Sequence, residues 1–545
     1  MRLIFLKIAR YKQLHDFEIR FSKQSELLDA PFVRFLIGKN GSGKSTVLEA
    51  LALIFTRIMH DETPGFDFEL QYAVQIGKEE RVIRVTPNDA PIRTYRLSVQ
   101  IAISEKHLLD AKKEEQPFSR LTDYHPSKII ASSSGPAQQM EEALIHSPLS
   151  SLISDIYDLS RRSPATANVG ELERLKTSIR QHHQDPKFLF MGPQTAPFVL
   201  IALCAMLPQE QSEQGAYINK RHSLLQIVKD FQPVWFTLTV NEAILQQLEH
   251  GELKPTEEAL RIFCQLIGCM TSEMDDSVGD LYDACQRTAA YKEEELFPAI
   301  NRTFYYFFES SDETPCCAPK LKDICSPFTL FAALTAAWRN GWLSSAHLGF
   351  HLDEVDGLLY ETALSDGEFM WLARMGLLLL ARDSVLPNVL FLLDEPDVHL
   401  NEEWISHFVK WIDDFTTIGD NRGGLAFEPV PRYSHEIVVS THSTLMLTDA
   451  LPHQVYLITK NGVQIAGEHF ISTFAADRTE LYGNLYKLNV EEEKFAESYV
   501  KQMIQSGTPQ QLKELLNQLG PGYNRFQLRD KVVSLRHSES TRRDE

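Results

Sequence analysis

The sequence lacks the cysteine pattern of secreted and zinc-binding proteins. Its 545 residues include seven cysteines, none of which form a CxxC pair. Cys316 and Cys317 are adjacent, which suits neither a zinc site nor an ordinary disulfide. The odd count and the absence of a signal-peptide pattern at the start predict reduced thiols and a cytoplasmic protein.

An excess of positive charge is also missing. The formal net charge is −20, so the chain as a whole is not steered toward nucleic acid. Residues 174–187 form a basic stretch that could contact nucleic acid locally, although such a run is more often a solvated helix face. Its basic residues are Arg174, Lys176, Arg180, His182, His183 and Lys187.

The sequence has no uninterrupted apolar run long enough to cross a membrane. The most apolar stretch, residues 369–393, is broken by Arg374, Arg382 and Asp383. It therefore predicts a buried helix followed by a buried strand. Sustained heptads are absent as well, so a long coiled-coil arm is not expected.

The patterns that are present predict an α/β protein with a large helical insertion. Phe17, Ile19 and Phe21 alternate as in a strand, and residues 32–37 resemble a buried parallel strand. We expect a mixed sheet with helices on both faces, joined by an N-terminal antiparallel sheet. The expected segments are two halves of one domain (1–105 and 331–485), a mostly helical insertion (106–330) and a helical C-terminal segment with a disordered tail (486–545).

The strongest motif is a glycine-rich loop that fits G-x-x-x-x-G-K-[ST] between a predicted strand and a predicted helix. Its glycines allow backbone N–H groups to surround phosphates, and the helix N-terminus adds partial positive charge. Lys44 would contact the β- and γ-phosphates of ATP, and Ser45 would ligate Mg²⁺. The predicted phosphate-binding residues are Gly38, Lys39, Asn40, Gly41, Ser42, Gly43, Lys44, Ser45 and Thr46.

A second motif places two carboxylates at the end of an apolar strand. The run Val389–Leu393 is followed directly by Asp394 and Glu395. Asp394 would belong to the Mg²⁺ shell, and Glu395 would act as the general base that polarises the attacking water. Such a strand together with a phosphate-binding loop predicts nucleotide hydrolysis.

A third motif, Leu364-Ser365-Asp366-Gly367-Glu368, begins the predicted helix before that strand. Taken alone, Ser365 and Glu368 predict only a capping box. Its place about 30 residues before Asp394 resembles the signature of ABC ATPases, whose serine and glycine contact a γ-phosphate. Because a subunit's own glycine loop cannot reach this helix end in that architecture, Ser365 and Gly367 would act on ATP held by a second copy, in a head-to-head dimer.

Four further residues are candidates for the same site. Asp397 follows the two carboxylates at the position of the D-loop, and His442 follows a buried strand at the position of a γ-phosphate sensor. Gln71 could join the metal shell and Lys12 could touch phosphate, although an ordinary role is the more frequent one for both.

The motifs in this order resemble the ABC-type ATPases of the SMC, RecF and OLD group. The segments KIIASSSG (128–135), DEPDVHL (394–400), STHS (440–443) and LGPGYNRFQL (519–528) are most similar to the PtuA-like ATPases of Septu anti-phage systems and some retrons. This resemblance implies ATP and Mg²⁺ as cofactors and a PtuB-like HNH nuclease as partner. In a retron, a reverse transcriptase and its msDNA would be further partners.

Two alternatives to a regulatory ATPase stay open. An OLD-type enzyme with its own nuclease would need an Asp-x-Asp pair after His442, and the sequence has none there. A RecF- or SMC-like DNA-binding repair ATPase is disfavoured by the acidic charge and the missing arm.

Overall fold

The computed structural model divides the chain into two compact units, Met1–Phe474 and Ala475–Glu545. No helix among the described residues has the length and apolar character needed to cross a membrane. The structure describes residues 1–23, 33–77, 79–88, 97–108, 110–114, 116–134, 138–141, 143–144, 187–205, 232–270 (without 252, 254 and 256), 301–308, 321–352, 355–383, 386–416, 435–459, 462–486, 494–519 and 523–541.

The centre of the first unit is a seven-stranded mixed sheet. Its strands run parallel except for β16, which pairs antiparallel with β15. The apolar runs at residues 33–37, 389–393 and 435–440 are buried throughout, as strands covered on both faces should be. The spatial order is β16 (Gly462–Ile465), β15 (Val455–Thr459), β3 (Val33–Ile37), β14 (His435–Ser440), β13 (Val389–Asp394), β7 (Lys128–Ser133) and β8 (Phe188–Met191).

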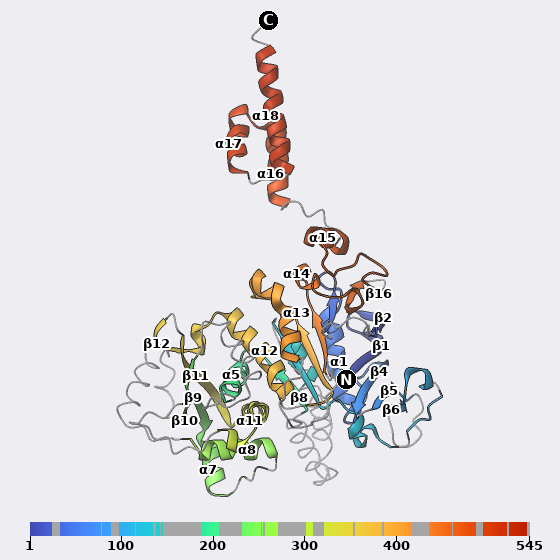
Figure 1. The fold of residues 1–545 in the computed structure, drawn as a ribbon, viewed down its shortest axis with the longest axis vertical. Helices are drawn as coiled ribbons and strands as arrows, with labels where there is room; N and C mark the ends of the chain where they lie inside the picture. The colour runs from blue at the N-terminus through green and yellow to red at the C-terminus, as the bar shows by residue number, and fades with distance from the viewer. Residues whose placement is uncertain are drawn as a thin grey trace, which may run out of the picture. The chain divides into compact units, whose positions relative to one another are not determined.

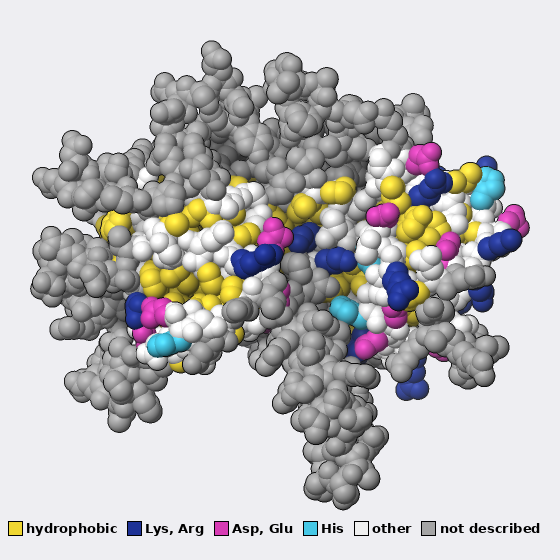
Figure 2. Space-filling model, turned by 90° about the horizontal axis from the view of Figure 1, so that it is seen from below, with side chains coloured by type: hydrophobic (Ala, Val, Ile, Leu, Met, Phe, Trp, Pro, Cys, Tyr) yellow, Lys and Arg dark blue, Asp and Glu magenta, His cyan; other side chains and the backbone are white. Residues whose placement is uncertain are grey.

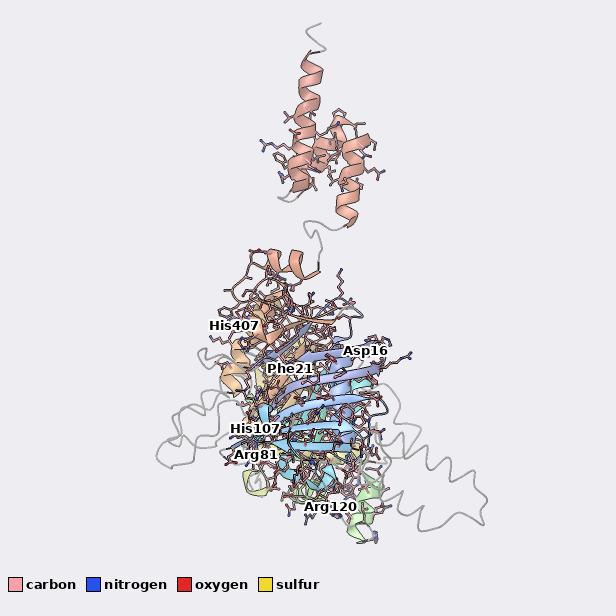
Figure 3. The ribbon with its side chains drawn as sticks, turned by 90° about the vertical axis from the view of Figure 1, so that its right-hand side faces the viewer. Asp16, Phe21, Arg81, His107, Arg120 and His407 are labelled. Atoms are coloured by element: carbon pink, nitrogen blue, oxygen red, sulfur yellow. The ribbon has the colours of Figure 1, made fainter. Side chains whose placement is uncertain are left out.

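A five-stranded antiparallel sheet lies beside it. In Figure 3, Asp16 on β2 and Arg81 on β5 lie toward opposite edges of this sheet. Its charged residues form cross-strand pairs such as Lys7–Glu18 and Arg84–Glu69. The order is β2 (Leu14–Arg20), β1 (Arg2–Tyr11), β4 (Phe68–Ile76), β5 (Glu79–Pro87) and β6 (Leu97–Ala102).

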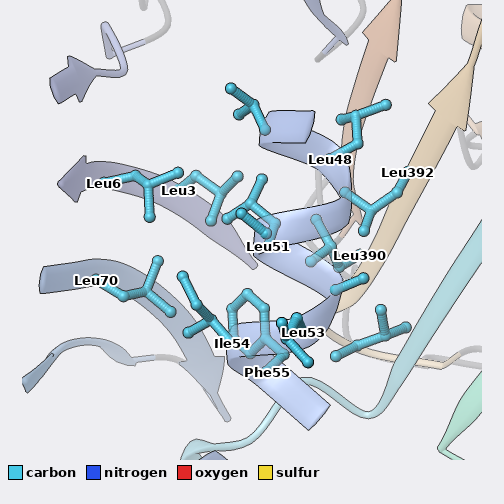
Figure 4. Close-up of a cluster of buried hydrophobic side chains, with 14 of the residues drawn as sticks. Leu3, Leu6, Leu48, Leu51, Leu53, Ile54, Phe55, Leu70, Leu390 and Leu392 are labelled. Atoms are coloured by element: carbon cyan, nitrogen blue, oxygen red, sulfur yellow. The ribbon is translucent and has the colours of Figure 1, made fainter. Parts of the chain in front are cut away.

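Helix α1 (Lys44–Ile58) fills the space between these two sheets. Its sequence is apolar on nearly every side, so the helix is buried almost all round. Figure 4 shows its leucines between Leu3 and Leu70 of the antiparallel sheet and Leu390 and Leu392 of β13. This core fixes the start of α1 at the end of β3, next to the carboxyl ends of β13 and β14.

Four helices pack together on the side of the central sheet away from α1 (Figure 1). Helix α12 contacts α5, α11 and α13, and its apolar residues are almost fully buried. A glycine allows close packing, since a Cβ on Gly376 would lie 2.4 Å from Leu203 Cδ1. The helices are α5 (Ala196–Ala205), α11 (Pro327–Arg339), α12 (Asp366–Asp383) and α13 (Glu402–Thr416). The fold is therefore α/β with helices on both faces of a mixed sheet, as expected.

The insertion, expected to be mostly helical with strands at residues 128–131 and 234–240, contains both of these strands and two more. Strands β7 and β8 extend the central sheet, and β9 (Gln232–Asn241) and β10 (Asn301–Phe307) form a separate four-stranded sheet with β11 (Leu343–Leu352) and β12 (Val355–Tyr360). Close packing supports this sheet, since a Cβ on Gly349 would lie 2.5 Å from the Trp235 ring. Polar residues interrupt the alternation in β10 and β11, which hid both strands from sequence periodicity.

Short helices accompany this sheet and the central one. Residues 169–182, 221–231 and 281–291 of the expected helical insertion lie outside the described residues, whereas residues 258–268 of that insertion form α8. The other α-helices in the described part of the first unit are α2 (Gln138–Glu141), α7 (Glu242–Glu249), α8 (Glu258–Gly268), α10 (Leu321–Ile324) and α14 (Thr444–Leu447).

The second unit is helical. Its core contains Leu512, Leu528 and Val532, which join α17 to α18. Thr508 caps α17, which begins at Pro509, and forms a capping box with Gln511. The helices are α15 (Arg478–Tyr486), α16 (Lys494–Ser506), α17 (Pro509–Gln518) and α18 (Tyr523–Thr541).

Candidate nucleotide site

The glycine loop joins β3 to α1 in backbone conformations that favour glycine. Gly43 caps α1 with φ 104°, in the left-handed region. A Cβ there would lie 2.8 Å from Leu14 Cδ2 on β2. The loop is closed by a hydrogen bond of 3.0 Å from the Ser42 amide to the Lys39 carbonyl. Residue type and local packing thus fix the shape of the loop.

The N-terminus of α1 has the properties of an anion site. It has no side-chain cap and no acidic residue in its first turn. Its first amides therefore lack the acceptor that a cap supplies, and they carry the positive end of the helix dipole. The buried Ser42 hydroxyl has no hydrogen-bond partner in the described part of the chain. These donors fit a phosphate group.

Lys44 extends from α1 toward the carboxyl ends of the central strands. Its Nζ lies 3.3 Å from the Gly38 carbonyl and 2.6 Å from His442 Nε2. Burial lowers the pKa of Lys44, while the carboxylates of Glu395, Asp394 and Asp397 raise it. Burial and then Lys44 lower the pKa of His442, so a neutral imidazole accepts the hydrogen bond from the ammonium.

Asp394 ends β13 between two serines of the neighbouring strands. Ser440 donates a hydrogen bond to Asp394 Oδ1 at 2.5 Å, and Ser133 donates one to Oδ2 at 3.3 Å. Because β14 and β7 flank β13 in parallel register, both hydroxyls arrive at the level of this carboxylate. The two bonds fix the orientation of the Asp394 carboxylate. Asp394 could hold a divalent cation together with the Ser45 hydroxyl, which lies in the exposed first turn of α1.

Glu395 follows in a left-handed conformation with φ 48°, which is unusual for a residue with a side chain. Its amide donates to the Ser440 carbonyl at 3.0 Å and to the Ser440 hydroxyl at 3.1 Å. Its Oε1 lies 3.4 Å from His442 Nε2. Burial, followed by Asp394, raises the pKa of Glu395, which strengthens it as a proton acceptor.

Asp397 lies beneath this turn. Its Oδ1 is buried without a hydrogen-bond partner among the described residues. Burial raises the pKa of Asp397, and Thr441, Arg374 and Lys44 lower it. Lys44, Asp394, Glu395, Asp397 and His442 therefore form one electrostatic cluster, although they come from three distant segments of the chain.

The signature residues lie at the exposed start of α12. Ser365 and Glu368 form a capping box, with the Ser365 hydroxyl 2.8 Å from Glu368 Oε2. Gly367 is buried, and a Cβ there would lie 2.3 Å from the His399 carbonyl oxygen. Among the described residues, no hydrogen bond joins Ser365 to the glycine loop of the same subunit.

Lys12 and Gln71 have partners within the fold. Lys12 Nζ lies 2.5 Å and 2.7 Å from the carboxylate oxygens of Glu49 on α1. Gln71 lies on β4, where its amide donates to Glu69 at 2.7 Å.

Of the basic stretch at residues 174–187, only Lys187 is among the described residues. Figure 2 shows basic and acidic side chains intermixed over the described part of one face.

Sequence reasoning missed the residues that orient the carboxylates. Ser133 and Ser440 lie at the carboxyl ends of β7 and β14, the strands that flank β13. Their place at the end of an apolar strand was the only feature of the sequence that could have indicated this role. Arg374 was noted only as an interruption of an apolar helix, yet it reaches the loop after β13. These roles depend on the strand order and on the packing of α12.

The fold and this cluster define an ABC-type P-loop ATPase domain. The chain belongs to the family described as "AAA domain, putative AbiEii toxin, Type IV TA system", which matches residues 34–448. No curated protein matches the chain.

Two solved structures similar to the chain have low sequence identity to it. The recombination mediator protein RecF, in a structure titled RecF-ATPrS in the RecFOR pathway, is 10% identical with a TM-score of 0.32, over 85% of this chain and 98% of RecF. The SMC head domain from Thermotoga maritima is 11% identical with a TM-score of 0.30, over 86% of this chain and 98% of that domain. The assignment rests on the family match and the site geometry.

Proposed function

We propose that the chain binds ATP with Mg²⁺ and hydrolyses it. The observation that carries this proposal is the convergence of Lys44, Asp394, Glu395 and His442 beside an uncapped helix N-terminus. Bound Mg²⁺ would supply positive charge to the phosphates during the reaction.

Each residue has a distinct role in this proposal. The glycine-loop amides and Lys44 bind the phosphates, and Ser45 and Asp394 hold the cation. Glu395 accepts a proton from the attacking water, and its fixed backbone keeps the carboxylate in one place. His442, whose Nε2 contacts Lys44 Nζ, would exchange that contact for one with the γ-phosphate.

The ATPase assay tests this proposal directly. Phosphate release by the purified chain should require Mg²⁺ and should be lost in Lys44→Ala. Lys7→Ala is the matched control, because Lys7 is an exposed lysine on β1 that pairs with Glu18. A wild-type chain that binds no ATP, or equal rates for wild type and Lys44→Ala, would contradict the assignment.

We also propose that two copies share each nucleotide. Ser365 and Asp366 are exposed, and the Ser365 side chain has its hydrogen bonds within the helix start, which supports a contact with a nucleotide on another subunit. Ser365→Arg should abolish hydrolysis while leaving ATP binding by the monomer unchanged. Mixed with inactive Lys44→Ala, it should regain activity, because hybrid dimers contain one intact site.

This rescue requires that the two sites act independently. A mixture as inactive as either variant alone, at concentrations where hybrids form, would mean either that the two sites are coupled or that they are not shared. Size-exclusion chromatography with light scattering, with and without ATP, provides the independent measurement. Dimers should increase with ATP in the wild type and should not increase in Ser365→Arg.

Finally, we propose that the ATPase controls a separate HNH nuclease in anti-phage defence. The similarity to PtuA-like ATPases at residues 128–135, 394–400 and 440–443 supports this role. The purified chain should show no nuclease activity alone, and should co-purify with an HNH nuclease encoded beside it. Nuclease activity in the chain alone would favour the OLD-type alternative, and tight salt-dependent DNA binding would favour the RecF- or SMC-like one.

A further inference from the structure

Arg374 is a buried cation in the third turn of α12. Its exposed fraction is 3%, and its neighbours Trp371, Leu372 and Met375 are fully or almost fully buried. Burial lowers the pKa of Arg374 to about 10, and Asp397 opposes this shift. A guanidinium in such surroundings is costly unless its donors are paired. The hydrogen-bond partners of Arg374 therefore explain why the otherwise apolar helix α12 contains an arginine at this position.

Among the described residues, Arg374 donates three hydrogen bonds, all to groups at the carboxyl ends of β13 and β7. Nη1 donates to the Pro396 carbonyl at 2.8 Å. Nη2 donates to the Ser134 hydroxyl at 2.5 Å, and Nε donates to the Ser132 hydroxyl at 3.3 Å. The planar guanidinium thus spans two loops that meet at the nucleotide site.

Ser134 continues the connection to the catalytic turn. Its hydroxyl donates to the Glu395 carbonyl at 2.5 Å, and its amide donates to the Asp394 carbonyl at 3.2 Å. Arg374 and Ser134 therefore hold the carbonyl groups of three consecutive residues, Asp394, Glu395 and Pro396. Ser440 holds the amide of Glu395 from the other side. The left-handed conformation of Glu395 is fixed between these contacts.

We propose that Arg374 is a positioning residue that links the signature end of α12 to the Asp394–Pro396 turn, so that nucleotide contact at Ser365 adjusts Glu395 in the same subunit. This inference rests on the proposed ATPase function and adds its regulation. Arg374 touches no phosphate itself.

The link would act between the two sites of a dimer. Ser365 of one subunit contacts the nucleotide on its partner, whereas Glu395 of that same subunit serves its own nucleotide. A rigid α12 with Arg374 at its buried side joins these two places through one short chain of hydrogen bonds. Occupation of one site would then favour hydrolysis at the other.

Arg374→Lys is the primary test. Lysine keeps the charge and reaches the same region, but it cannot donate to both loops in fixed geometry. We expect kcat for ATP to fall by about 10-fold or more, since small displacements of a reacting group have effects of this size. The Kd for ATP should change by less than about 3-fold, because the glycine loop is untouched.

Ser134→Ala is the second variant, and it removes one hydroxyl from a half-buried position. It should lower kcat in the same way with little effect on folding. The double variant should lose less than the product of the two single effects, because both changes break one chain of hydrogen bonds. In either single variant, the dependence of the rate on ATP concentration should become less cooperative than in the wild type.

Arg339→Lys is the matched control. Arg339 lies on α11, has a pKa lowered by burial to about 10 and donates to the Phe188 carbonyl at 2.9 Å, away from the turn. It should change thermal stability and leave kcat unaltered. Thermal unfolding of every variant separates loss of folding from loss of positioning.

The inference is overturned if Arg374→Lys or Ser134→Ala hydrolyses ATP at the wild-type rate. It is also overturned if kcat, ATP affinity and thermal stability all fall in parallel in both variants, which a merely structural role would produce. An inactive wild-type chain would instead refute the ATPase function, and the inference would fall with it.

Discussion

Replacing Glu395 with glutamine tests the chemistry of the site most directly. Glutamine has the same shape, and both hydrogen bonds from the residue 395 amide to Ser440 are made by the backbone. The turn should therefore keep its conformation. What is lost is the proton acceptor, and general-base assistance contributes about 10²- to 10⁴-fold to the rate. We expect kcat to fall within this range.

The affinity for ATP should not fall together with the rate. Glu395 is a negative charge in the same cluster as Lys44, and its side chain is 33% exposed. Two unit charges about 5 Å apart interact by roughly 3 kcal/mol at an effective dielectric constant of about 20, and solvent screening reduces this for a partly exposed group. Removing the charge next to the phosphates should leave ATP affinity equal to that of the wild type or tighter.

The assay combines phosphate release under single-turnover conditions with equilibrium binding of ATP. Glu403→Gln is the control, because Glu403 is an exposed carboxylate at the start of α13. The variant Glu395→Gln should trap ATP-bound dimers, which light scattering detects. Hydrolysis at the wild-type rate would refute the assignment of Glu395, and a large loss of ATP affinity would refute the electrostatic reasoning.

Three further predictions concern stability and packing. Glu436→Leu should destabilise the protein by about 3–5 kcal/mol in denaturant unfolding, because it leaves the buried Arg34 guanidinium without its 2.9 Å ion pair. Adding Arg34→Met should recover most of this loss, and no recovery would contradict the ion-pair explanation. A hydrogen bond to Glu361 raises the pKa of His347, so this pair should stabilise the fold fully below about pH 6.5. That contribution should disappear as pH rises through the folded-state pKa of His347. If the difference in unfolding free energy between wild type and His347→Gln is the same at every pH, this explanation is wrong. Gly367→Ala should reduce ATP hydrolysis at least about 10-fold without weakening ATP binding, because the new Cβ would lie 2.3 Å from the His399 carbonyl oxygen. Hydrolysis at the wild-type rate would show that the backbone at His399 moves aside without cost.

The phosphate-binding loop was predictable because its structure is local. The conformation of Gly43 and the start of α1 at Lys44 follow from consecutive residues and from the buried strand before them. The same holds for the carboxylates after β13 and for the capping box at Ser365. In each case the residue types and the element boundary lie within about ten positions of one another.

The antiparallel sheet of β9–β12 was harder to predict from the sequence. Strands β9 and β10 pair across about 60 intervening positions, which include α7 and α8, and β11 pairs with β9 from more than a hundred positions away. Polar residues such as His347 and His351 interrupt the apolar alternation in β11, so periodicity alone gave a weak signal. Pairing across such distances depends on the assembled core rather than on local preference.

The sequence by itself determined the elements that carry the chemistry: a glycine loop shaped by residues without side chains, a buried strand ending in two carboxylates, and a helix start at Ser365. Only the tertiary structure decided which groups act on one another. The parallel order of β3, β14, β13 and β7 brings Lys44, His442 and Asp394 together, and the packing of α12 places Arg374 against their turn. Backbone shape is set by neighbours in the chain, whereas hydrogen bonds and charges between distant segments exist only when burial of the shared core fixes those segments in space.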